Sequence, residues 1–75
     1  SLDAQAAEEM SRLLSNSMML GDAVTITLFH EHDDIRFTGQ VLKLDPTVRT
    51  LRLLTSNGTR DVQMNLITNV TLANE

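Results

Sequence analysis

The hydrophobic pattern of the chain changes from a helical period to a strand period near residue 21. Over residues 4–19 apolar side chains recur every three or four positions, with Asp3 placed to cap the first turn and Gly21 suited to a helix end. The apolar positions are Ala4, Ala7, Met10, Leu13, Leu14 and Met18. We interpret this stripe as a helix face packed on a sheet. The alternative is an amphipathic helix that docks onto a partner protein.

Residues 22–72 form short alternating runs separated by turn signals. The first run, VTITL, is rich in β-branched side chains and puts Phe29 on the wetter face of the strand. In the second run the apolar phase shifts just after Gly39, which is typical of a strand that bends sharply or that another backbone approaches closely. Turns are predicted at Asp45-Pro46-Thr47 and at Asn57-Gly58, where the residue types favour chain reversal.

Together these elements predict a mainly β fold in a single domain, residues 1–75. An N-terminal helix would pack on a small five-stranded antiparallel barrel of the Sm-like or SH3-like kind. A chain of 75 residues supports one small core, and the absence of cysteine excludes disulfides as a source of stability. Dense packing and self-association are the remaining sources.

Charge is distributed unevenly along the chain. Residues 1–34 carry seven acids against one base, whereas residues 35–64 carry five bases against two acids. The basic segment is a candidate nucleic-acid strip, although arginines on a solvated sheet are the commoner explanation. Without Trp or Tyr there is little to stack on bases, so we expect any such binding to be weak. The candidate residues are Arg36, Lys43, Arg49, Arg52 and Arg60.

The segment His30-Glu31-His32-Asp33-Asp34 collects side chains that can ligate metals. In an extended conformation His30, His32 and Asp34 would share one side, but nothing else supplies a fourth ligand. We therefore interpret the segment as a solvated loop and expect no metal. No nucleophile motif and no phosphate-binding glycine loop is present, so we expect neither a catalytic site nor a cofactor.

No apolar run is long enough to cross a bilayer, and no secretory signal opens the chain. We therefore expect a cytoplasmic protein without membrane contact. The chain begins at Ser1 and not at methionine, which suggests that it is a fragment of something longer.

The bent second run resembles that of Sm-type proteins in the spacing of Gly39, Val41 and Asp45. Arg49, however, stands where Sm proteins place the asparagine of their nucleotide pocket, and residues 67–70 lack the Arg-Gly pair of that family. The RNA-binding residues of Sm proteins are therefore not transferred to this chain.

A closer resemblance covers residues 8–72 and points to the YolD-like family of small bacterial proteins. It is carried by a T-G-x-V-x-K-x-D-P segment, formed here by Thr38, Gly39, Val41, Lys43, Asp45 and Pro46. The resemblance implies an accessory protein, encoded near Y-family translesion DNA polymerases, that serves as a UmuD-like partner in the DNA-damage response. It implies no residue roles.

The function that these observations favour is a non-enzymatic protein-interaction module. An open barrel leaves strand edges that can accept a further strand, and the candidate docking side chains are Leu13, Met18 and Phe29. The expected partner is a Y-family polymerase or a second copy of the chain. The alternative is an Sm-like ring that binds nucleic acid.

Overall fold

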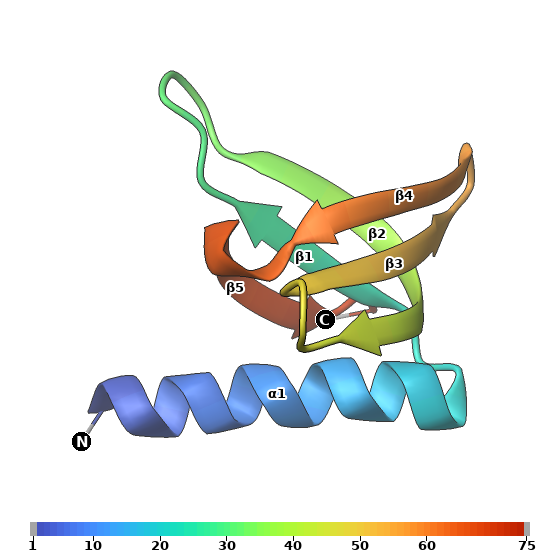
Figure 1. The fold of residues 1–75 in the computed structure, drawn as a ribbon, viewed down its shortest axis with the longest axis horizontal. Coiled ribbons are helices and arrows are strands. Elements are labelled where there is room, and N and C mark those ends of the chain that lie inside the picture. Colours follow the sequence, from blue (N-terminus) through green and yellow to red (C-terminus); the bar gives the residue numbers. More distant parts are fainter. Residues whose placement is uncertain (1, 75) are drawn as a thin grey trace.

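The computed structural model describes residues 2–74, in which one long helix is followed by five strands (Figure 1). Neighbouring strands are antiparallel and lie in the order β4-β3-β2-β1-β5. The elements are α1 (Leu2–Leu20), β1 (Val24–Leu28), β2 (Ile35–Asp45), β3 (Thr50–Thr55), β4 (Gly58–Gln63), the 3-10 turn η1 (Met64–Leu66) and β5 (Ile67–Leu72).

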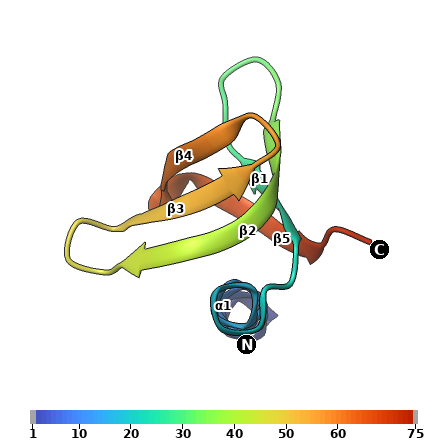
Figure 2. The same cartoon turned by 90° about the vertical axis from the view of Figure 1, so that its right-hand side faces the viewer.

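The predicted fold class is confirmed: the chain is mainly strands, and its N-terminal helix packs on a five-stranded antiparallel sheet. The sheet curves strongly, as seen along the helix in Figure 2, but it does not close into a barrel. Strands β4 and β5 stand at opposite ends of the strand order and do not pair with each other. The part of the chain that the structure describes therefore has two sheet edges.

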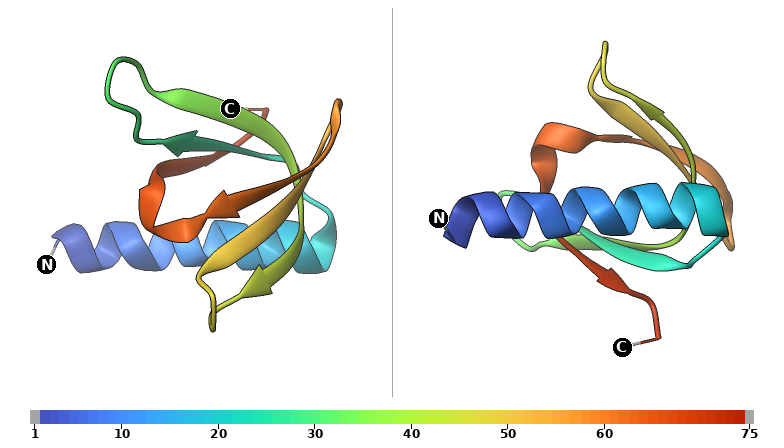
Figure 3. Two further views of the ribbon diagram at one scale, coloured as in Figure 1. Left: turned by 45° about the horizontal axis from the view of Figure 1, so that its top comes forward. Right: turned by 90° about the horizontal axis from the view of Figure 1, so that it is seen from below.

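Helix α1 lies across one open end of the curved sheet (Figure 2 and Figure 3), where it contacts β1, β2 and β5. It begins at Leu2, so Asp3 lies within its first turn and is not the cap predicted from the sequence, although its charge still suits a helix N-terminus. At the other end the Gly21 N–H donates to the Ser17 carbonyl oxygen at 3.0 Å, and Gly21 has a φ of +83°. A glycine in this left-handed conformation is a common way to end a helix.

Strand β2 bends at a β-bulge that explains the shift in its apolar phase. The register with β3 changes between Val41 and Lys43, so Leu42 has no cross-strand partner and is 42% exposed. Because of this extra residue, Val41 and Leu44 both reach the core although they are three positions apart. The bend predicted after Gly39 is confirmed.

The core lies inside the curve of the sheet and is covered at one end by α1. Its buried apolar side chains come from the helix and from all five strands, which makes the described chain one packing unit. They are Leu13, Leu14, Val24, Ile26, Val41, Leu51, Leu53, Val62 and Val70.

Ser17 links the helix to the sheet by a buried hydrogen bond. Its side chain is fully buried, and its Oγ accepts the Val41 N–H at 2.9 Å. We expect Ser17→Ala to lower the free energy of unfolding by about 1–3 kcal/mol, because it leaves a buried amide without a partner. The measurement is a urea titration followed by circular dichroism.

The control for this prediction is Ser11→Ala, at an exposed position on the same helix. Its effect should stay within about 0.5 kcal/mol. If the two variants unfold at the same urea concentration, the bond between Ser17 and Val41 does not stabilise the fold.

Candidate interaction site

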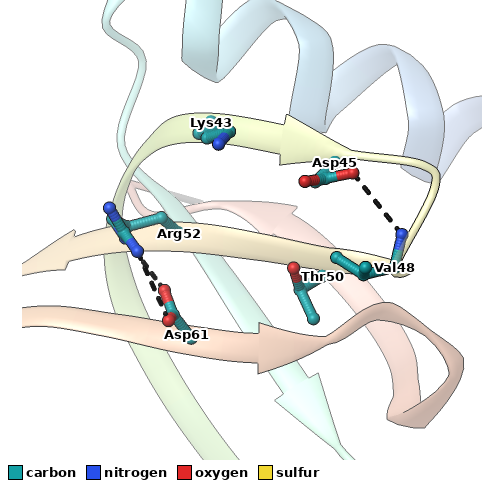
Figure 4. A pocket seen from close by; sticks show the side chains of 6 residues that line it. All are labelled: Lys43, Asp45, Val48, Thr50, Arg52 and Asp61. Carbon is teal, nitrogen blue, oxygen red and sulfur yellow. Dashed lines mark hydrogen bonds and ion pairs between the residues drawn. The ribbon is translucent and has the colours of Figure 1, made fainter.

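The structure divides the predicted basic strip. Lys43 of β2 and Arg52 of β3 are cross-strand partners and line a surface hollow of about 220 Å³ (Figure 4). The Arg52 Nε donates to Asp61 Oδ1 at 2.9 Å, and its Nη2 lies 3.5 Å from Asp61 Oδ2. The remaining lining residues are Asp45, Val48 and Thr50. Two cations and two carboxylates thus share the hollow, and Arg52 already has an anionic partner.

The other three basic residues lie elsewhere. The Arg60 guanidinium stacks on the Phe37 ring, 4.4 Å from its centroid, and Arg60 is the cross-strand partner of the buried Leu53. Arg36 lies on β2 beside β1, and Arg49 ends the turn between β2 and β3 with a φ of 56°. The structure therefore brings Lys43 and Arg52 together and does not join all five residues into one strip.

The three predicted docking residues have different environments. Leu13 is only 7% exposed and belongs to the core, which corrects its interpretation as a docking residue and confirms that the helix stripe packs on the sheet. Met18 is 37% exposed, and Phe29 is 58% exposed just beyond β1. Both remain accessible, but they extend from different elements.

The loop after β1 shows no metal-binding arrangement. The rings of His30 and His32 are 6.0 Å apart, and the His32 N–H points to His30 Nδ1 at 3.4 Å. Within residues 2–74 no three histidine, cysteine or acidic side chains come together as a metal site. In the same residues no helix combines the length and apolar character that a bilayer crossing requires.

The two sheet edges are the surfaces that the topology leaves open. Within the described residues, 2–74, β4 has only β3 as a neighbour, and β5 has only β1. Unpaired backbone groups along such an edge can form hydrogen bonds with an added strand. Sequence reasoning predicted open edges but could not say which strands would carry them, because strand order depends on long-range pairing.

The helix and nearly all of the five strands fall within the match to a known family. A model of YolD-like proteins matches residues 1–71 of the chain. The chain belongs to the YolD-like family. Comparisons with curated proteins and with solved structures give no match.

In this YolD-like chain the T-G-x-V-x-K-x-D-P segment shapes the bend and the turn that follows it. Gly39 lies against the backbone of Leu54, and Val41 is fully buried. The Asp45 Oδ1 accepts the N–H groups of Thr47 at 3.1 Å and Val48 at 3.4 Å. The segment therefore has structural tasks, and no binding role follows from it.

The ion pair in the hollow predicts an acid-dependent contribution to stability. The hydrogen bond from Arg52 holds the pKa of Asp61 below its ordinary value of 3.8, with a further contribution from the charge of Lys43, while Asp61 raises the pKa of Arg52. A carboxyl whose pKa is lower in the folded state stabilises the fold above its unfolded pKa, and this stabilisation is lost as the pH falls through the folded pKa.

We therefore expect Asp61→Asn to be slightly less stable than the parent at neutral pH, because both partners are exposed. The difference should disappear as the pH falls below 3.8. Thermal unfolding followed at several pH values measures it. A difference that persists or grows in acid would contradict this assignment.

Proposed function

We propose that this YolD-like protein is a non-enzymatic protein-interaction module that serves a Y-family translesion DNA polymerase as an accessory partner in the cytoplasm of a bacterium, within the DNA-damage response. The observation that carries the interaction role is the open sheet, whose edge strands β4 and β5 each pair on one side only. The polymerase is inferred from the family resemblance.

The chemistry of the described side chains favours an interaction role over catalysis. The ion pairs between Glu9 and Arg12 and between Arg52 and Asp61 are exposed, and the four charges in them neutralise one another. A catalytic acid or base usually sits in a cleft where burial shifts its pKa strongly. The hollow around Lys43 is lined by side chains of neighbouring strands, and its two cations are matched by two carboxylates.

The test is a mixture of this protein with the purified Y-family polymerase encoded in the same genome. Light scattering on a sizing column, at low and at high salt, should show a species whose mass is the sum of the two partners. Separate elution at both salt concentrations would contradict the proposal. A run of this protein without the polymerase gives its own molar mass as the reference.

One observation supports the alternative, an Sm-like oligomeric ring that binds nucleic acid. Two different free edges at the ends of one sheet are what a head-to-tail ring requires. The division of the basic strip argues against nucleic acid as the ligand. A molar mass of about five or more copies, together with salt-sensitive binding to oligonucleotides, would favour this alternative.

A further inference from the structure

The edge of β5 that faces away from β1 carries backbone N–H and C=O groups that no neighbouring strand pairs with in the described chain. The Ala73 N–H donates to the Ala23 carbonyl oxygen at 2.9 Å. Backbone bonds of an antiparallel pair recur at every second residue, so Thr71 also faces β1, while the N–H and C=O groups of Val70 and Leu72 point away from it. These outward groups can form hydrogen bonds with an added strand.

The residue types of β5 allow such an addition. Its sequence, ITNVTL, contains no charge, no proline and no glycine. Four of its six residues are β-branched, and three are apolar. Proteins usually protect a free edge with charges or proline. Strand β4, at the opposite edge, follows this rule with the adjacent charges of Arg60 and Asp61. Of the two edges, β5 is the one suited to accept a strand.

The helix provides a wall beside this edge. The first turns of α1 extend past β5, as Figure 1 and the right-hand view of Figure 3 both show. Ala6 and Glu9 are exposed on these turns and follow the same line of the helix as the buried Leu13. We call the outward backbone of Val70 and Leu72, together with the first turns of α1 that extend past β5, the β5 ledge.

The surroundings of the β5 ledge are acidic. The exposed helix residues 3–9 carry Asp3, Glu8 and Glu9, of which Glu9 is paired with Arg12 one turn later. At the other end of β5 a hollow of about 340 Å³ is lined by Asp22, Ala23, Leu72 and Asn74. Asp22 beside Leu72 and the acids of the first helix turns therefore make these surroundings negative, and positively charged side chains would complement them.

We propose that the β5 ledge is the docking site for an extended, basic segment of the partner protein, which joins the sheet as a strand beside β5. This inference rests on the proposed interaction function and adds the surface and the chemistry of the partner. A second copy of the chain suits the ledge less well, because each copy has a net charge of −4 and its other edge strand, β4, carries Asp61 next to Arg60.

The first experiment uses a capped peptide of alternating lysine and valine, with a glutamate and valine peptide of equal length as its control. NMR of the labelled protein should show that the lysine peptide shifts the amide signals of Val70 and Leu72 and slows their hydrogen exchange. The glutamate peptide should bind about ten-fold more weakly or not at all, because its charges are repelled.

Two matched variants test whether the backbone of β5 makes the contact. Leu72→Pro and Leu72→Ala both remove the same half-buried side chain, but only proline removes the outward N–H. We expect the lysine peptide to bind Leu72→Pro about ten-fold more weakly than Leu72→Ala. If Leu72→Pro does not fold, Glu9→Lys replaces it and should reverse the preference between the two peptides.

Several results would overturn the inference: no binding of the lysine peptide, equal binding to Leu72→Pro and Leu72→Ala, or protection at β4 amides instead. Protection of Val70 and Leu72 in a self-associated protein without peptide would make a second copy the occupant. A polymerase complex that forms equally well with Leu72→Pro and Leu72→Ala would overturn the β5 ledge and leave the proposed function standing. Peptide binding without any polymerase complex would overturn the proposed function and leave the β5 ledge standing.

Discussion

Replacing Gly39 with alanine is expected to unfold the protein. A Cβ atom at this position would overlap the Leu54 carbonyl oxygen and lie 2.8 Å from the Leu54 carbonyl carbon. These are backbone atoms, so no side-chain rotation relieves the clash, and β2 and β3 would have to separate where Gln40 pairs with Leu54. Overpacking commonly costs about 1–3 kcal/mol. Displacing a strand costs more, and a domain of this size has little stability to lose.

The measurement is a urea or thermal titration of Gly39→Ala, with Gly58→Ala as its control. Nothing lies within 4 Å of a Cβ built at Gly58, but its φ of +106° favours glycine. The control should therefore lose only about 1–2 kcal/mol, for the backbone conformation alone. If Gly39→Ala is as stable as the control, the close approach of β2 and β3 does not require a glycine.

Leu13→Asp is the second substitution expected to abolish the fold. Leu13 is 7% exposed among the core residues, and removing such a side chain alone costs about 2–5 kcal/mol. The new carboxylate would in addition lose its hydration without gaining a partner, which adds to the cost. We expect circular dichroism to show loss of the native spectrum at temperatures where the parent is folded.

Met19→Asp is the matched control, because Met19 is on the same helix and 76% exposed. Its stability should remain within about 0.5 kcal/mol of the parent. A folded Leu13→Asp that no longer binds the polymerase would show that the helix stripe serves docking and not packing. Unfolding of Leu13→Asp beside a stable Met19→Asp would establish the packing role.

Several features could be predicted because they depend on residues close together in the chain. The change of period near residue 21 separates the helix from the strands, since helical and extended backbones place neighbouring side chains in different directions. The turn at Asp45 follows from a side chain that bonds to the backbone two and three residues later. The shift in phase after Gly39 correctly indicated the bend.

Other features could not be predicted because they join residues far apart in sequence. The bond between Ser17 and Val41 spans 24 positions, and the pair between Arg52 and Asp61 depends on the register of β3 with β4. That register places Asp61 beside Arg52, so a residue counted as part of a basic strip is neutralised by its neighbour. Composition alone counts charges and does not place them.

The sequence by itself determined the order and type of the elements and the position of the main bend, because periodicity, turn residues and glycine act through local backbone geometry. Only the tertiary structure decided which strands form the open edges of the sheet, β4 and β5. Closure depends on how curvature from the bulge in β2 accumulates across strands, and on hydrogen bonds between elements that no local pattern specifies. The surface available to a partner is therefore a property of the fold.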